Sequence, residues 1–246
     1  ESDIKEVNWG NVAIDVVIES TGRFRSRSLL EAHLDSGAKK VILAAPSLDN
    51  SVKTIVLGVN DSLLDETDTI ISNASCTTNS AASLINIIDT HWSIESAYIT
   101  TVHSFTNDQN LHDSFHLDLR RSRSAISSII PTTTGAAKAL TKIFPHLSNK
   151  IGGCGIRVPV PNGSLTDLTC IVSKQATINE VNSVFRDSRD IYLDYTDDPL
   201  VSVDILGTSF SSIFDSDLTS VIGKMIKVVA WYDNESGYSH RLADLV

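Results

Sequence analysis

Apolar residues in the first third of the chain form short runs separated by one helical segment. Residues 12–18 (VAIDVVI), 39–45 (KKVILAA) and 54–59 (TIVLGV) are rich in β-branched side chains, which predicts three buried strands. Between the first two, residues 27–36 place leucines at helical spacing, and Gly37 suits the end of a helix. A strand, a helix and a strand in close succession predict a βαβ unit, and therefore a parallel sheet covered by helices.

The pattern changes near Cys76. A short strand (69–72) is followed by a predicted helix at 77–90 and a long strand at 94–104, after which the chain is polar and irregular to about residue 124. The later pattern predicts a short helix at 132–144, strands at 152–160, 164–172 and 224–232, a helix at 178–188, and an amphipathic helix in the last stretch, SGYSHRLADLV. The first part therefore reads as α/β, and the part after Cys76 as α+β.

Charge and cysteine content narrow the class of protein. The 246 residues carry a net charge of −10, which argues against a general binder of nucleic acid or of anionic membranes. No apolar stretch approaches the roughly 20 residues of a membrane span. Three cysteines without a CxxC spacing indicate a reducing compartment and argue against a disulfide scaffold or a metal site. Because the chain starts at Glu1 and its one methionine is Met225, we expect its N-terminal part to be missing.

Cys76 stands in the stretch SNASCTTN, at the point where a predicted helix begins. Unpaired N–H groups and the helix dipole favour a thiolate there, so the thiol is expected to ionise easily and act as a nucleophile. The stretch is equally compatible with a helix cap in which Cys76 is a small apolar filler. His103, at the end of a predicted strand, is a candidate base, although a lone histidine is more often a packed core residue.

Basic and hydroxyl residues gather locally in this acidic chain. LRRSR contains Arg121, Arg157 interrupts an apolar strand, and PTTTGAAK places hydroxyls and a glycine at a helix start. A charge in an apolar strand is costly unless it is paired or faces a site. Together these segments predict a pocket for phosphates. Taken singly, LRRSR also fits a solvated surface run, and TTTG also fits a helix cap.

Six motifs follow one another in order: SNASCTTN, HSFTNDQ, LRRSR, TTTGAAKA, IRVPVPNGSLTDLT and WYDNESGYS. In these the chain resembles the glyceraldehyde-3-phosphate dehydrogenase family over nearly its whole length; SNASCTTN is shared with the related erythrose-4-phosphate dehydrogenases. The resemblance implies an α/β fold: an incomplete Rossmann-type dinucleotide-binding domain at 1–75, completed by the C-terminal helix 235–246, and an α+β catalytic domain with a mainly antiparallel sheet at 76–234.

The resemblance also implies roles for single residues. Cys76 matches the nucleophile, and His103 matches the base that holds it as thiolate. Thr106 and Arg157 match positions that hold the substrate phosphate. The positions that match the site of the attacking phosphate are Ser75, Thr77, Arg121, Thr134 and Gly135. Asn234 matches the residue that holds the nicotinamide amide, and Ala44 a cofactor-contacting position that is commonly serine. The implied cofactor is NAD or NADP, and the implied state is a cytoplasmic homotetramer acting on a sugar phosphate and inorganic phosphate.

Two departures from the family pattern stand out. The chain has no G-x-G-x-x-G turn, which binds the dinucleotide in such folds, so the 246 residues alone are expected to be inactive. Ser236 stands where the family usually has tryptophan. The alternatives are an erythrose-4-phosphate dehydrogenase, a cofactor-independent thiol acyltransferase or hydrolase, and a non-catalytic binding protein. Dependence on a nicotinamide cofactor separates the hydrolase from the dehydrogenases.

Overall fold

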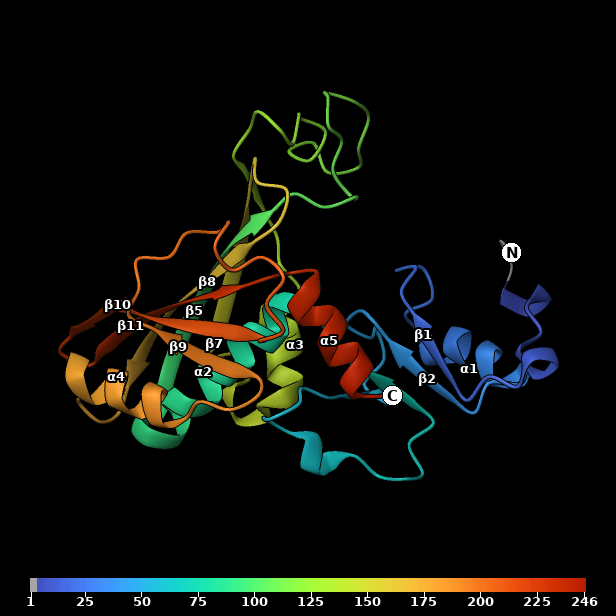
Figure 1. Ribbon diagram of the computed structural model, residues 1–246, viewed down its shortest axis with the longest axis horizontal. Helices are drawn as coiled ribbons and strands as arrows, with labels where there is room; N and C mark the ends of the chain where they lie inside the picture. Colours follow the sequence, from blue (N-terminus) through green and yellow to red (C-terminus); the bar gives the residue numbers. More distant parts are fainter. Residues whose placement is uncertain (1–3) are drawn as a thin grey trace. The chain divides into compact units, whose positions relative to one another are not determined.

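The computed structural model describes residues 4–246, which fall into two compact units. The first comprises the described residues up to Ser75 together with Ser239–Val246, and the second comprises Cys76–Tyr238 (Figure 1). Each unit is described by itself. No helix among residues 4–246 has both the length and the hydropathy that crossing a bilayer requires.

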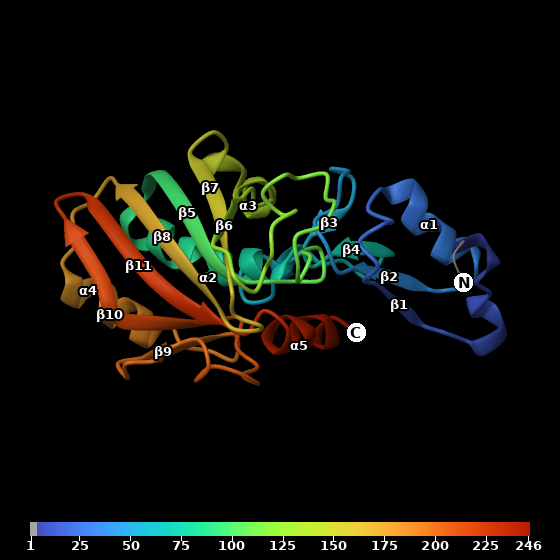
Figure 2. The ribbon, with the colours of Figure 1, turned by 90° about the horizontal axis from the view of Figure 1, so that it is seen from above.

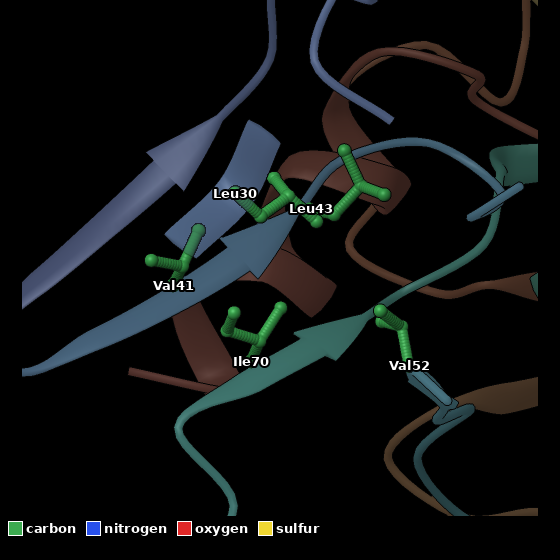
Figure 3. Close-up of a cluster of buried hydrophobic side chains, with 5 residues drawn as sticks. All are labelled: Leu30, Val41, Leu43, Val52 and Ile70. Carbon is green, nitrogen blue, oxygen red and sulfur yellow. The ribbon is translucent and has the colours of Figure 1, made fainter. Parts of the chain in front are cut away.

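The first unit is built on a four-stranded parallel sheet, which confirms the predicted βαβ arrangement. Its strands lie in the order β1-β2-β4-β3, with bounds β1 (Val16–Glu19), β2 (Lys40–Leu43), β3 (Lys53–Thr54) and β4 (Ile70–Ser72). Helix α1 (Arg27–Asp35) contributes Leu30 to an apolar cluster with Val41, Leu43, Val52 and Ile70 (Figure 3). Short 3-10 turns lie at Ile4–Glu6, Trp9–Val12 and Asp61–Leu63.

A second apolar cluster in this unit contains β-strand residues and the end of the chain. Ile42, Ile55 and Ile71 are buried there, and Leu242 and Leu245 pack against them. Ile42 lies between Val41 and Leu43, and successive strand residues point to opposite faces, so the two clusters cover the two faces of the sheet. Leu242 belongs to helix α5 (Ser236–Asp244), which confirms the predicted C-terminal helix.

The first predicted strand begins later than its apolar pattern suggested. Val12 lies in a 3-10 turn and is exposed, and Ala13 has a left-handed backbone with φ of 49°. A strand cannot continue through a left-handed residue, so β1 starts only at Val16.

The prediction of a third strand at 54–59 is also wrong for most of these residues. β3 ends at Thr54, and the Asn60 side chain curls the following segment. Its Oδ1 accepts from the N–H of Val56 at 2.7 Å, and its Nδ2 donates to the carbonyl of Thr54 at 2.9 Å. Ile55 still donates to the carbonyl of Ser72 on β4 at 2.8 Å, but from Val56 on the Asn60 bonds replace strand pairing. Ile55 and Val56 stay buried and account for the apolar pattern.

The second unit is built on a seven-stranded mixed sheet in the order β6-β7-β5-β8-β11-β10-β9. Four of its six pairings are antiparallel, which confirms the mainly antiparallel sheet. The strands are β5 (Ile94–Ser104), β6 (Ile130–Thr132), β7 (Ile151–Val158), β8 (Ser164–Val172), β9 (Leu193–Thr196), β10 (Ser212–Ile222) and β11 (Met225–Tyr232). Strands β6, β9 and β10 were not predicted.

Three helices cover one face of this sheet: α2 (Cys76–Trp92), α3 (Ala136–Ile143) and α4 (Ile178–Asp187) (Figure 2). A single 3-10 turn, Pro145–Leu147, follows α3. Helix α2 confirms the helix predicted after the SNAS segment, and most of its residues are buried. Its polar Ser80 lies within hydrogen-bond distance of Thr166 Oγ1 at 3.0 Å and Ser212 Oγ at 3.2 Å, so the hydroxyl is not left unpaired inside the unit.

Residues 105–129 contain neither helix nor strand, which confirms the irregular segment predicted after the long strand. In Figure 1 this green segment extends beyond the ends of the sheet strands. It carries strongly exposed apolar side chains, among them Phe115 at 87% and Leu117 at 92% exposure. Single exposed apolar side chains are ordinary on protein surfaces, whereas several within one segment favour an interaction surface.

Candidate active site

Strand ends from the second unit bring the candidate residues together. His103 lies near the end of β5 and Arg157 near the end of β7; the two strands are parallel, and the two residues are register partners. Tyr232 ends β11 and pairs with Ser164, which begins β8. The site therefore forms where the carboxyl ends of three strands meet the start of a fourth.

Cys76 and His103, which the sequence proposed as nucleophile and base, lie next to each other. Cys76 is the first residue of α2, and its Sγ is 3.5 Å from His103 Nε2. His103 is 6% exposed, and its ring meets the edge of the Tyr232 ring, with centroids 6.0 Å apart. The distance allows direct proton transfer between sulfur and nitrogen.

The Cys76 thiol ionises less easily than its position at a helix start predicted. Burial raises the pKa of Cys76, and this effect is larger than the lowering by the Thr77 N–H and hydroxyl and by the Arg157 charge. The helix-start effect is thus present, but desolvation of the thiolate is larger. Burial and the nearby Arg157 charge also lower the pKa of His103, to about 4. At neutral pH both partners are therefore uncharged in this arrangement.

The two other cysteines lie away from any such partner. Cys170 is buried in β8, and burial raises its pKa to about 12. Cys154 lies in β7, where Sγ is 3.8 Å from Thr100 Oγ1. Among residues 4–246, no three His, Cys, Asp or Glu side chains gather in a way that could hold a metal ion.

Tyr232 links the first turn of α2 to the sheet, and the sequence analysis did not identify it. Its hydroxyl lies 2.8 Å from Thr77 Oγ1 and 2.8 Å from Thr101 Oγ1, and the residue is 1% exposed. Thr77 was expected to bind an anion. Its hydroxyl contacts Tyr232 inside the unit and links the helix start that carries Cys76 to the sheet, and anion binding by Thr77 stays a prediction.

Two of the candidate phosphate residues, Thr106 and Arg121, share one carboxylate. Both the Thr106 hydroxyl and the Arg121 guanidinium donate to Asp108, and Arg121 also donates to Thr132 Oγ1 at 2.9 Å. Arg157 is half-buried and makes no ion pair within 4 Å among the described residues. An oxyanion could replace the Asp108 carboxylate on the first two groups and neutralise Arg157.

Thr134 and Gly135 lie directly before α3. Thr134 Oγ1 accepts from the N–H of Ala136 at 3.2 Å, and space beside the Gly135 Cα is open. Gly135 is the N-cap residue of α3, and no side chain makes a capping bond there, so the Thr134 contact is a local turn rather than the helix cap of the alternative interpretation. The remaining hydrogen-bonding capacity of the Thr134 hydroxyl is available to a ligand.

Asn234 has one end of its amide fixed and the other available. Its Oδ1 accepts from Ser104 Oγ at 2.9 Å and from Ser164 Oγ at 2.7 Å, which orients Nδ2 away from the two hydroxyls. An amide N–H₂ held in this way suits the carbonyl of a carboxamide ligand such as nicotinamide. Neither serine was identified from the sequence, since each reaches Asn234 only through strand pairing.

Two candidates belong to the first unit. Ala44 follows β2, and its N–H already donates to the carbonyl of Glu19 at 2.9 Å, so that group is not available to a ligand. Ser75 is half-buried and directly precedes Cys76 in the chain.

The first unit is a parallel α/β unit, and in the second a cysteine–histidine pair lies beside an arginine that has no carboxylate partner among the described residues. These features are typical of a two-unit α/β enzyme. The family model described as "Glyceraldehyde 3-phosphate dehydrogenase, C-terminal domain" matches residues 75–234 of this chain. The chain belongs to the glyceraldehyde-3-phosphate dehydrogenase family, which confirms the resemblance seen in its motifs.

Several relatives cover nearly the whole chain. It is 51% identical over 242 residues to glyceraldehyde-3-phosphate dehydrogenase of Mycobacterium bovis, covering 97% of this chain and 71% of the relative. The enzyme of Mycobacterium leprae is 50% identical over 242 residues, with the same coverage. The enzyme of Clostridium acetobutylicum is 45% identical over 248 residues, covering 98% of this chain and 74% of the relative.

Proposed function

We propose that this protein catalyses the phosphorylating oxidation of glyceraldehyde 3-phosphate with a nicotinamide dinucleotide. The 3.5 Å contact between Cys76 Sγ and His103 Nε2, next to an arginine that has no carboxylate partner among the described residues, carries the proposal. We propose the first unit as the dinucleotide-binding part and the second as the catalytic part.

The chemistry uses Cys76 and His103 in turn. The Cys76 sulfur adds to the aldehyde carbon, and the carbonyl oxygen receives the proton that His103 took from the thiol. His103 then removes the hydroxyl proton as the hydride leaves the same carbon, giving a thioester on Cys76. The bound dinucleotide supplies the hydride acceptor. An oxygen of hydrogen phosphate finally attacks the thioester carbon, and Cys76 leaves as thiolate while the acyl phosphate forms. The phosphate proton passes to solvent, and the proton that His103 took from the hydroxyl returns to the Cys76 sulfur.

The two phosphates have separate proposed partners. Thr106 and Arg157 hold the phosphate of the sugar. Residues for the attacking phosphate are proposed at Ser75, Thr77, Arg121, Thr134 and Gly135. The Thr77 hydroxyl contacts Tyr232, and a hydroxyl can make a further hydrogen bond to a ligand. Asn234 and Ala44 are proposed for the cofactor. Asn234 Nδ2 would donate to the nicotinamide carboxamide, and Ala44 would offer its carbonyl oxygen, because its N–H is bonded to Glu19.

Formation of the reduced dinucleotide tests the proposal. Because the 246 residues alone are expected to be inactive, the assay uses the full-length protein, in which absorbance of the reduced cofactor should rise only when aldehyde, inorganic phosphate and NAD or NADP are all present. Cys76→Ser should abolish the signal, and His103→Gln should lower it by roughly a hundredfold or more. Turnover of a thioester without any dinucleotide would favour a thiol hydrolase, and activity that survives in Cys76→Ser would contradict the proposal.

We also propose a homotetramer in the cytoplasm. The exposed apolar side chains of segment 105–129 support an interface between copies, and three free cysteines suit a reducing compartment. Native mass spectrometry at micromolar concentration should show four chains, whereas a monomer would contradict the assembly.

A further inference from the structure

The side-chain amide of Asn234 is held by two serine hydroxyls that lie at the ends of paired strands. Ser104 ends β5, Ser164 begins β8, and Asn234 follows the end of β11 by two residues. Asn234 Oδ1 accepts from Ser104 Oγ at 2.9 Å and from Ser164 Oγ at 2.7 Å. The two serines are 0% and 1% exposed, so water cannot take the place of the amide on either hydroxyl.

The hydrogen-bond donors and acceptors of this cluster fix which end of the amide faces the serines. Ser164 Oγ also accepts from the backbone N–H of Ser104 at 3.2 Å, whereas its own proton goes to Asn234 Oδ1. Among the described residues, Oδ1 is the only acceptor to which either hydroxyl donates. Turning the amide by half a turn would place Nδ2 there and leave both hydroxyl protons buried without an acceptor. The amide is therefore held in one orientation.

The other end of the amide presents two donors and no acceptor. Asn234 Nδ2 makes no hydrogen bond within residues 4–246, and it is not among the fully buried polar atoms there that lack a partner, so a ligand can reach it. Two N–H groups fit the carbonyl oxygen of a nicotinamide carboxamide, whereas the carboxamide N–H₂ would need an acceptor. Ser104 directly follows His103 on β5, so the strand end that carries the proposed base also holds this amide.

We infer that Ser104 and Ser164 are positioning residues that make Asn234 a hydrogen-bond donor to the cofactor, so that the protein recognises the nicotinamide ring by its carboxamide oxygen and not by its amino group. The inference rests on the proposed function, in which Asn234 contacts the nicotinamide. Both serines act through Asn234, since their hydroxyl protons are already used inside the unit. A dinucleotide whose ring carries a carbonyl but no amino group should therefore keep the whole contribution of Asn234 to binding.

Calorimetry with two dinucleotides measures which atom Asn234 recognises. The full-length protein is titrated with NAD and with the acetylpyridine analogue of NAD, which keeps the carbonyl on the ring but lacks the amino group. Asn234→Leu should weaken the binding of both by the same factor, about tenfold, because both lose the bond to the carbonyl. If Asn234 instead accepted from the amino group, the substitution would weaken the binding of NAD alone.

Variants of the two serines test the positioning role. In Ser104→Ala/Ser164→Ala the amide can turn, and NAD can bond to either of its ends, whereas the analogue can bond only to Nδ2. The ratio of the Kd of the analogue to the Kd of NAD should therefore rise about twofold, since about half of the molecules then present the competent end. Ser104→Thr/Ser164→Thr keeps both hydroxyls and should show the wild-type ratio. Ser212→Ala, which removes a buried hydroxyl beside Ser80, should not change the ratio.

The outcomes separate this inference from the proposed function. Asn234→Leu that weakens the binding of NAD alone, or of neither dinucleotide, overturns the inference even if the double alanine variant fails to fold. An unchanged Kd ratio in the double alanine variant, or the same rise in the double threonine variant, overturns the role of the serines. Full-length wild-type protein that binds neither dinucleotide would instead count against the proposed function.

Discussion

Replacing Tyr232 by phenylalanine should destabilise the second unit by a defined amount. The change removes one hydroxyl group and leaves the ring in place. That hydroxyl bridges Thr77 on the first turn of α2 and Thr101 on β5, at 2.8 Å in each case. All three residues are at most 5% exposed, so water cannot readily take the place of the phenol.

The magnitude follows from the two hydrogen bonds. A neutral hydrogen bond between buried groups contributes about 1 kcal/mol, and a buried partner left unsatisfied adds a desolvation cost. Two bonds therefore correspond to about 2–3 kcal/mol in the free energy of unfolding. Because Thr77 follows Cys76, the start of α2 should also open more often, and hydrogen exchange at its first turn should become faster.

Urea unfolding followed by tryptophan fluorescence measures the effect. Trp9 lies in the first unit, so a Trp9→Phe background leaves Trp92 and Trp231 to report on the second unit. Tyr195→Phe is the matched control: its hydroxyl accepts from Arg186 at an exposed position, and the loss should be below about 0.5 kcal/mol. A Tyr232→Phe loss as small as that of the control would refute the reasoning.

Three further predictions concern pH, anion binding and a helix cap. Because the pKa of His103 falls from 6.5 in the unfolded chain to about 4 in the folded one, stability should fall by roughly 3 kcal/mol as pH drops from 6.5 to 4. His103→Gln should remove that part of the pH dependence in urea titrations. Asp108→Asn should tighten inorganic phosphate roughly threefold in calorimetry, because Arg121 and Thr106 lose a competing carboxylate; weaker binding would show that Asp108 positions them instead. Thr177→Ala should cost about 1 kcal/mol by removing the capping box of α4, whereas an unchanged melting transition would show that the box contributes nothing.

The sequence predicted the fold where local pattern and tertiary structure agree. The apolar run of helix α2 from Ala81 to Ile88 is buried as its pattern requires, whereas the burial of the polar first turn, from Thr77 to Ser80, could not be predicted from that pattern. Strand β10 was missed because Asp215 and Asp217 interrupt its apolar residues. Asp215 is nonetheless buried, since its carboxylate accepts from Trp231 Nε1 at 2.9 Å on the neighbouring strand. A partner 16 residues away cannot be seen in a local pattern.

The site shows the same limit. Cys76 and His103 were found because a helix start and a strand end both mark positions that chemistry can use. The direction in which the pKa of Cys76 shifts was not predicted. The effect of the helix start is visible in the sequence, whereas the burial that outweighs it is not. Tyr232 lies 155 residues from Thr77, so only the folded sheet brings their hydroxyls together.

The register between β5 and β7 makes activity a sensitive measure of correct folding. His103 and Arg157 are partners in a parallel pairing, and a slip of one residue would turn Arg157 to the opposite face of the sheet. Such a molecule would keep its helices, most of its sheet and much of its buried surface. Circular dichroism would count it as native, yet it would lack the arginine beside His103. Specific activity after refolding therefore reports the fraction of molecules in the right register, which spectra of secondary structure cannot distinguish.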